Sequence, residues 1–145
     1  MNYKAVAVIL FLFGAPKGNK VLQPFKIPNW ILEDKEFFRR FIQRLFDCEG
    51  TPDCEGAIMI EMWKSQELLD EGLEFFQSIK LKLKEYFDIE TSNPFTYKTN
   101  KIRKDGIKTV PIIIKIRRKD SLAKFFKHIG FENVEKQRRL SLFMR

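Results

Sequence analysis

The sequence predicts an α+β domain in which helices cover one face of an antiparallel sheet. Segments with apolar residues at helical spacing alternate with short strand-like segments, and two of the strand-like segments flank a two-residue hairpin signal. The length of 145 residues suits one domain with a single continuous core. We therefore expect one domain over residues 1–145, made of an N-terminal strand extension over 1–31 and a core over 34–142.

The N-terminal extension is expected to form an additional β-hairpin. Residues 5–13 are nine consecutive apolar residues, far fewer than the ~20 that span a bilayer, so we expect a buried strand and no membrane partner. A turn rich in Pro, Gly and Asn follows at residues 15–19. Residues 21–27 are then expected to return beside the first strand.

A helix is predicted to end within residues 41–50, FIQRLFDCEG, which are the most informative part of the chain. Its apolar residues form one wide stripe at helical spacing: Phe37, Phe38, Phe41, Ile42, Leu45 and Phe46. Gly50 is expected to end the helix in the left-handed conformation. Asp47 and Glu49 then lie at the negative end of the helix dipole, which favours compensation by a cation such as a metal. A solvated helix end is the alternative.

The rest of the core is predicted as strand, helix and hairpin. Residues 57–63 alternate as a strand, and residues 66–87 form a long or broken helix that begins after Ser65. Residues 95–103 and 107–117 are expected to pair across Asp105-Gly106, with Lys104 opposite Ile107. In that register one sheet face is apolar and carries Phe95, Tyr97, Ile112, Ile114 and Ile116. The other face is polar and carries Thr96, Lys98, Asn100, Lys115 and Arg117.

Basic residues are concentrated in the later hairpin. The chain has 27 basic and 19 acidic residues and a net charge of +8, and residues 98–119 hold nine basic residues and one acidic residue. A polyanion, with double-stranded DNA as the main candidate, is the expected partner. The expected DNA contacts are Lys98, Asn100, Lys101, Arg103, Lys115 and Arg117. An ordinary solvated outer surface of the sheet is the alternative.

Cysteine usage indicates a reducing compartment. Cys48 and Cys54 have no second cysteine pair or histidine partner that would indicate a zinc site. Nothing in the sequence indicates a disulfide-dependent secreted fold. We therefore expect a cytoplasmic location.

Three segments, in order along the chain, resemble parts of one known protein family. Residues 42–50, IQRLFDCEG, resemble the nine-residue signature of the LAGLIDADG homing endonucleases, with Leu45, Asp47 and Gly50 identical. The upstream KIPNWILEDKEFFRR resembles the lead-in of that family, and the downstream DSLAKFFKHIGFENVEKQRRL resembles its closing helix. Together these segments cover roughly residues 24–142. The resemblance implies an αββαββα unit, an antiparallel sheet with helices on one face.

The same resemblance implies a catalytic site. Glu49 matches the family's position that holds the catalytic Mg²⁺, and a glutamate supplies the hard oxygen ligands that this ion prefers. Lys115 matches a basic position that supports the site, and Lys64 matches a second polar position. Glu49, Lys115 and Lys64 are therefore the expected catalytic residues.

The resemblance also implies an assembly. One signature is present, so a complete cleavage site implies a homodimer in which this helix pairs with its copy through Arg44, Asp47 and Cys48. Asp47 is expected to cap or brace the paired helix ends. Arg44 stands where the family usually has glycine, and close helix approach would bury or displace its guanidinium unless it is paired. A carboxylate such as Asp47 of the partner subunit is one such pairing.

The expected function is a metal-dependent, homing-type DNA endonuclease that acts as a homodimer. In a first alternative, a protein of the same lineage binds DNA in a salt-dependent way but has lost cleavage, which the departure at Arg44 favours. In a second alternative, a basic module uses Phe-rich surfaces for protein contacts. That module would show no affinity for DNA at low salt.

Overall fold

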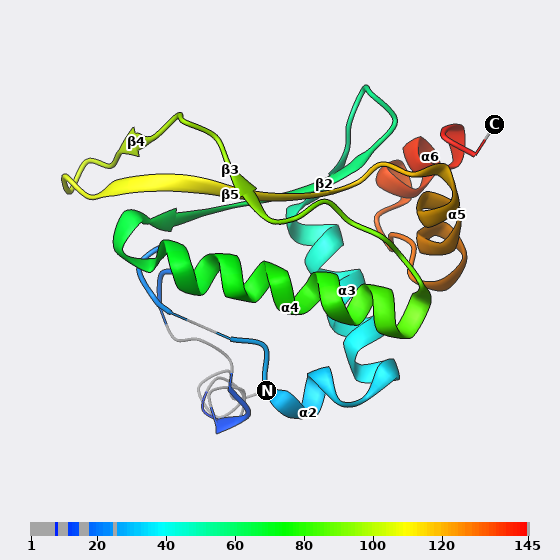
Figure 1. Ribbon diagram of the computed structural model, residues 1–145, viewed down its shortest axis with the longest axis horizontal. Coiled ribbons are helices and arrows are strands. Elements are labelled where there is room, and N and C mark those ends of the chain that lie inside the picture. Colours follow the sequence, from blue (N-terminus) through cyan, green and yellow to red (C-terminus); the bar gives the residue numbers. More distant parts are fainter. Residues whose placement is uncertain (1–7, 9–11, 15–17, 25, 145) are drawn as a thin grey trace.

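The computed structural model describes residue 8 and residues 12–14, 18–24 and 26–144. Those residues form five α-helices, one short 3-10 helix and five strands (Figure 1). In chain order they are α2 (Asn29–Leu32), α3 (Lys35–Glu49), β1 (Gly50–Pro52), β2 (Ile58–Ser65), η1 (Gln66–Leu68), α4 (Leu69–Phe87), β3 (Phe95–Thr96), β4 (Lys101–Ile102), β5 (Lys108–Ile116), α5 (Lys119–His128) and α6 (Val134–Leu142). The predicted α+β class is confirmed.

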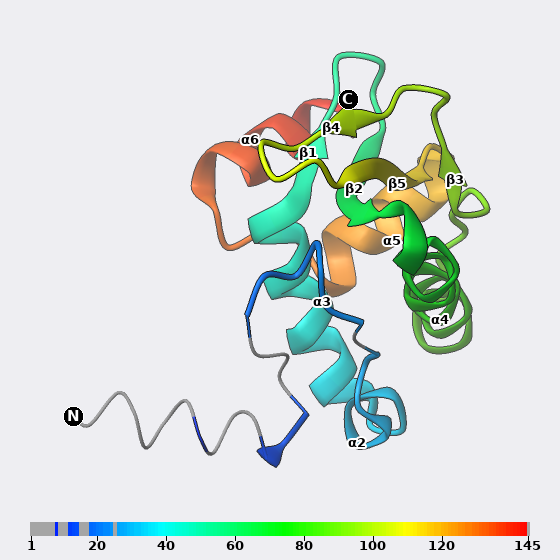
Figure 2. The ribbon, with the colours of Figure 1, turned by 90° about the vertical axis from the view of Figure 1, so that its left-hand side faces the viewer.

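The strands form one antiparallel sheet, as predicted. Their order is β1-β2-β5-β3, and β4 also pairs with β5. The long central strands β2 and β5 pair from Ile58 opposite Ile116 to Ser65 opposite Thr109. In Figures 1 and 2, α3, α4 and α5 lie on one side of this sheet, and no helix of the described residues covers the other side. We call the uncovered side the open face.

Helix α3 packs into the core through one row of side chains. Phe38, Ile42 and Phe46, which follow one another at a spacing of four residues, are at most 1% exposed. Phe46 packs on Phe125 with ring centroids 4.7 Å apart, which ties α3 to α5. Phe37 belongs to the predicted apolar stripe but is 54% exposed. The buried stripe is therefore narrower than predicted.

Strand β2 and helix α4 complete the core. Ile58, Ile60 and Met62 of β2 are buried on the helix side of the sheet, as their alternation predicts. Helix α4 begins with the 3-10 turn η1, so the predicted break in this helix lies at its start. A Cβ atom on Gly72 would lie 2.3 Å from Cδ1 of Ile112, so glycine allows α4 to pack closely on β5.

The N-terminal hairpin is not confirmed. Residues 5–7 and 9–11 of its first predicted strand lie outside the described residues, and Val8 and Leu12 are helical rather than extended. The second predicted strand is wrong for residues 21–24, 26 and 27, because Asn19 starts a turn in which its side chain accepts a hydrogen bond from Val21. This segment runs past α3 toward the sheet (Figure 2), where Val21 accepts a hydrogen bond from Ser65 N–H. The described residues include no helix with the length and apolar character needed to cross a membrane.

The predicted register of the later hairpin is wrong by one residue at β4 and by three residues at β3. Arg103 N–H donates to the carbonyl of Ile107, so the turn holds three residues instead of two. Gly106 takes a positive φ of 80° at the last turn position, and the carboxylate of Asp105 accepts a hydrogen bond from Ile107 N–H. The irregular residues 97–100 add two further residues of slip, so Phe95 pairs with Ile113 instead of Ile116 and moves from the predicted apolar face to the open face. Residues 97–100 leave the strand line between β3 and β4.

Candidate nucleic-acid interface

The open face is formed by every second residue of the central strands. On β2 these residues are Met59, Glu61 and Trp63, and antiparallel pairing places Lys115 beside Met59 and Ile113 beside Glu61. Lys115 therefore lies on the open face, on the side predicted for it.

Lys115 is paired with a carboxylate that was not among the predicted site residues. Lys115 is 8% exposed, and its Nζ lies 3.8 Å from Oδ2 of Asp53 in the turn between β1 and β2. Asp53 Oδ1 accepts hydrogen bonds from the N–H groups of Glu55 and Ala57, both at 2.9 Å, which fix this carboxylate. An Asp-Cys-Glu-Gly turn is the only sequence signal for this role of Asp53.

Four cations of the later hairpin, two of which are predicted DNA contacts, have no partner in the described part of the chain. Lys98, Lys104, Lys108 and Arg117 are exposed and form no ion pair or hydrogen bond with described residues. Lys98 lies between β3 and β4, Lys104 and Lys108 lie around the hairpin turn, and Arg117 follows β5. Exposed cations without carboxylate partners are available to a polyanion.

Other predicted contacts have partners within the chain. Lys101 Nζ lies 4.6 Å from the centre of the Trp63 ring, and the Arg103 guanidinium lies 3.1 Å from the carboxylate of Asp105. Asn100 is exposed in the irregular segment at 97–100. The structure thus brings the predicted contacts to the open face and the hairpin, but not onto the regular two-stranded ribbon that we expected.

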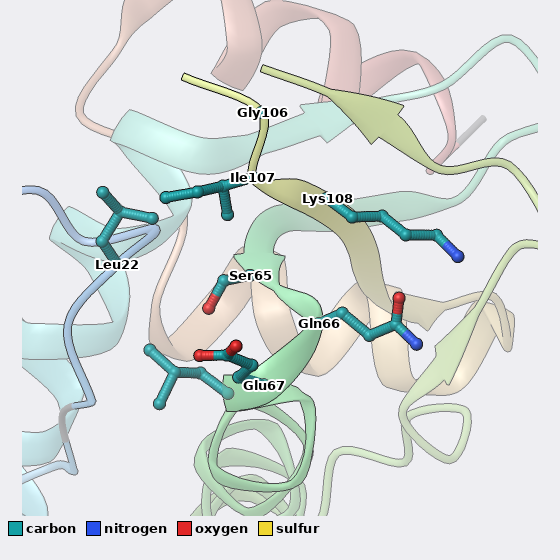
Figure 3. A pocket seen from close by; sticks show the side chains of 8 residues that line it. Leu22, Ser65, Gln66, Glu67, Gly106, Ile107 and Lys108 are labelled. Carbon is teal, nitrogen blue, oxygen red and sulfur yellow. The ribbon is translucent and has the colours of Figure 1, made fainter. Parts of the chain in front are cut away.

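A groove with a volume of about 710 Å³ opens beside the hairpin turn (Figure 3). One wall is the turn at residues 106–108, and the opposite wall is formed by residues 65–68 with Leu22. Its lining is mixed, with Leu22 and Ile107 beside Glu67 and Lys108. Glu49 does not line this groove, so the groove is separate from the predicted metal position.

Glu49 lies at the junction between α3 and β1. Gly50 does not end the helix in the predicted left-handed conformation; its φ of −83° and ψ of 147° lead directly into β1. Glycine is needed there for a different reason, because a Cβ atom would lie 2.6 Å from the carbonyl oxygen of Phe46. The Glu49 side chain is 27% exposed, and its Oε1 accepts a hydrogen bond from Lys20 Nζ. Lys20 was missed in the sequence because it lies 29 residues away.

Lys64 lies on the opposite side of the sheet from Lys115. It is 3% exposed on the helix side, and its Nζ donates to the carbonyls of Lys20 and of Gln23, the latter at 2.9 Å. Lys20 therefore contacts both Glu49 and Lys64. Lys64 therefore lies near the partner of Glu49 and apart from Lys115, so the three predicted catalytic residues do not share one face of the sheet.

The environment of Lys64 makes the stability of the protein depend on pH. Burial lowers the pKa of Lys64 from 10.5 to about 8, with a further lowering by Lys20 and an opposing effect of Glu71. Between these two pH values the unfolded chain binds more protons than the folded chain, so stability rises with pH across this window. We expect the melting temperature of the native protein to rise by about 6 °C from pH 7.5 to 9.5, relative to Lys64→Met. Equal pH profiles of the two proteins in a thermal melt would contradict this expectation.

Two residues of the predicted helix interface, Asp47 and Arg44, bind residues of their own chain. Asp47 accepts hydrogen bonds from the N–H groups of Glu132 and Asn133, at 3.2 and 3.1 Å, and its carbonyl accepts one from Lys136 at 2.6 Å. Asp47 therefore braces the start of α6 of its own chain. Arg44 pairs with Glu132 at 2.7 Å, and its side chain remains 69% exposed. The carboxylate that pairs with Arg44 is therefore Glu132 of the same chain and not Asp47 of the partner subunit.

The rest of this helix face is solvent-accessible in the single chain. Cys48, the third predicted interface residue, is exposed and free, one turn beyond Arg44. Gln43 is bound to the carbonyl of Ile129 at 2.7 Å. The exposed row of Arg44 and Cys48 is thus the part of the predicted interface that a second copy can reach.

The described residues place one carboxylate, that of Glu49, at the predicted metal position. Glu49 has a partly exposed carboxylate of the hard-oxygen type that Mg²⁺ prefers. Among the described residues no group of three or more His, Cys, Asp or Glu side chains is placed to hold a metal ion. An ion at Glu49 would have to replace the Lys20 ammonium and take further ligands from water, substrate or a second copy. The described residues therefore do not form a complete Mg²⁺ site by themselves.

Comparisons with known proteins give partial similarities. No model of a protein family and no solved structure matches the chain. A replication factor C small subunit of Methanocaldococcus jannaschii is 30% identical over 137 residues, which are 90% of this chain and 7% of that protein. A tRNA-splicing ligase RtcB of the same organism is 38% identical over 97 residues, covering 61% of this chain and 10% of that protein. A tRNA-splicing ligase RtcB of Pyrococcus abyssi is 26% identical over 118 residues, or 73% of this chain and 13% of that protein. The chain thus spans 7–13% of the length of these curated relatives.

Proposed function

We propose that the chain is a DNA-binding protein of the LAGLIDADG homing-endonuclease type, which cuts double-stranded DNA as a homodimer with Mg²⁺. The observation that carries the proposal is the group of exposed, unpaired cations at the later hairpin, which border the open sheet face, together with a helix that ends in the signature carboxylate of Glu49. Lys115 lies on the same face but is buried and paired with Asp53, so it supports the face and does not carry the DNA contact. The element order supports it, because α3-β1-β2-α4, then β3 and β4 with β5, then α5 is the expected αββαββα order.

The comparisons support a segment that occurs within proteins of otherwise different function. Similar segments make up small parts of proteins whose names denote different activities, a replication factor subunit and tRNA-splicing ligases. Neither activity explains a segment that both kinds of protein share. A homing-type element that inserts into unrelated proteins does explain it.

The chain's own residues would perform most of the binding. Exposed lysines of the hairpin hold phosphates by charge, and the salt dependence of binding follows from the counterions they displace. Phe46 and Gly50 fix the end of α3, which sets the position of Glu49. Glu49 of each subunit would hold Mg²⁺, which would supply Lewis-acid stabilisation of the phosphate charge. Both cysteines are free and exposed, and we propose a cytoplasmic location on that basis.

The test is incubation of the purified protein with plasmid DNA, with and without Mg²⁺, alongside a gel shift and a measurement of mass in solution. The proposal predicts a dimer that shifts DNA and makes Mg²⁺-dependent double-strand breaks. Double-strand breaks by a strict monomer would contradict one site per subunit. The absence of any shift at low salt would favour a protein-contact module over DNA binding.

Binding without cleavage is the second candidate, and the Lys20 contact favours it. The ammonium of Lys20 occupies the carboxylate of Glu49 that a metal would need. A partly exposed ion pair is worth about 1 kcal/mol or less, which corresponds to roughly a fivefold change in metal occupancy. A DNA-binding protein without cleavage would shift DNA and leave it intact at every Mg²⁺ concentration, whereas competition by Lys20 alone would raise the Mg²⁺ concentration needed by about fivefold.

Lys20→Met therefore has an expected effect on cleavage. The change removes the competing ammonium and should raise the nicking rate at limiting Mg²⁺ by about fivefold. Lys26→Met is the matched control, because Lys26 lies on the same segment and pairs with Glu74 at 3.1 Å instead. Equal nicking rates of both variants across a Mg²⁺ titration would contradict competition at Glu49.

A further inference from the structure

We propose that the open sheet face binds single-stranded nucleic acid by stacking unpaired bases on Trp63 and Tyr97. This inference rests on the proposed nucleic-acid binding and names a second class of substrate for the same face. It does not depend on Glu49 or on cleavage.

Aromatic side chains gather on this face. Trp63 of β2 lies beside Pro111 of β5, and Phe95 lies beside Ile113 on the other edge of β5. Tyr97 packs edge-on against Phe95, with ring centroids 5.6 Å apart and planes at 82°, and is 46% exposed. The solvent side of a half-covered antiparallel sheet is ordinarily polar, so aromatic rings there need a partner.

The Trp63 ring is held in place from its edge. Its Nε1 donates to Glu61 Oε1 at 2.8 Å, which leaves the ring faces to other contacts. Lys101 Nζ lies over this ring at 4.6 Å from the centroid. A phosphate draws such an ammonium toward itself, and the ring face is then free for a base.

The arrangement of charge fits a nucleic-acid strand. Lys98 and Lys101 follow the exposed Tyr97 in the sequence, and Lys98 has no partner among the described residues. Alternation of cations with aromatic rings is the pattern by which sheets bind single strands, where lysines follow the backbone and rings stack on bases.

Unpaired bases suit these rings better than duplex DNA does. In a duplex the faces of the bases are stacked on one another and only their edges are open in the grooves. Side chains on a flat sheet reach base faces when the strand is single. Stacking on one aromatic ring changes affinity by roughly tenfold or more.

The test measures binding with one tryptophan as the reporter. In a Trp30→Phe background, Trp63 is the only tryptophan of the chain. We expect its fluorescence to be quenched on titration with a thymidine 12-mer or a uridine 12-mer, and the two arms distinguish DNA from RNA as the strand that is bound. A duplex 12-mer is expected to bind without comparable quenching.

Two variants keep the test falsifiable if one of them fails to fold. Tyr97→Ala is expected to weaken single-strand binding about tenfold, and Trp63→Phe is expected to weaken it less. Both variants are expected to change duplex binding by less than about twofold. Duplex binding with no quenching of Trp63, or equal losses on both ligands, would overturn this inference and leave the proposed function standing. If none of the three oligonucleotides binds, both this inference and the proposed function are overturned.

Discussion

Replacing Glu49 by Gln is expected to abolish Mg²⁺-dependent cleavage while DNA binding is retained. The amide keeps the shape of the side chain at the end of α3 but removes the negative charge that a hard cation requires. The loss of cleavage should be at least about 100-fold, since the charge acts directly on the reacting phosphate. The lost ion pair with Lys20 is partly exposed, so stability should change little.

The control for this experiment is Glu36→Gln. Glu36 is an acidic residue at the start of the same helix that pairs with Arg39 at 2.7 Å and is not matched to a metal position. Its replacement should leave Mg²⁺-dependent cleavage largely intact. Cleavage by the Glu49→Gln protein at the native rate would remove Glu49 from the proposed site.

Replacing Phe46 by Ala is expected to cost about 3–5 kcal/mol of unfolding free energy. Phe46 is 1% exposed and contacts the rings of Phe125 and Phe131, with centroids 4.7 and 6.4 Å away. Removal of the ring leaves a cavity between α3 and α5 that close packing cannot fill without shifting the end of α3. Because Glu49 follows in the next turn, its position should become less well fixed.

Urea denaturation measures this loss, and Phe37→Ala is the matched control. Phe37 lies on the same helix, is 54% exposed and contacts Trp30 at a centroid distance of 5.5 Å. The same chemical change there should cost about 1 kcal/mol or less. Similar losses for the two variants would mean that α3 packs through a different face.

Local periodicity was sufficient to predict the elements that build the core. The spacing of Phe38, Ile42 and Phe46 requires a helix with one buried row, and the alternation of Ile58, Ile60 and Met62 requires a strand with one buried face. Both patterns depend only on neighbours in the chain. They fixed the α+β class and the order of elements.

Features that depend on tertiary placement could not be predicted in this way. The hairpin register was wrong by one residue at β4 because a three-residue turn with a positive φ at Gly106 replaced the two-residue turn. It was wrong by three residues at β3 because residues 97–100 leave the strand, and an odd slip exchanges the two faces. Lys20 approaches Glu49 only because residues 18–24 turn at Asn19 and run to the end of β2. The apolar run at 5–13 gave no information on that path.

Only part of the candidate site was predicted, because some of its features are local and others depend on tertiary placement. Lys115 lies on the open face because its strand parity is a local property. Lys64 was assigned from resemblance alone, and its parity places it on the helix side, where the carbonyls of Lys20 and Gln23 bind it. The partner of Arg44, Glu132, lies in a connection whose position follows from the packing of α6.

The salt dependence of duplex DNA binding tests the central claim most directly. The measurement is the slope of log Kobs against log salt for the native protein and for the variant Lys98→Ala/Lys104→Ala/Lys108→Ala. The control is Lys80→Ala/Lys82→Ala/Lys84→Ala, which removes the same charge from α4 on the helix side of the sheet. We predict that the hairpin variant loses affinity and that its slope becomes shallower by about 2–3, while the control keeps the native slope. Equal slopes for the two variants would contradict binding through the open face and its hairpin.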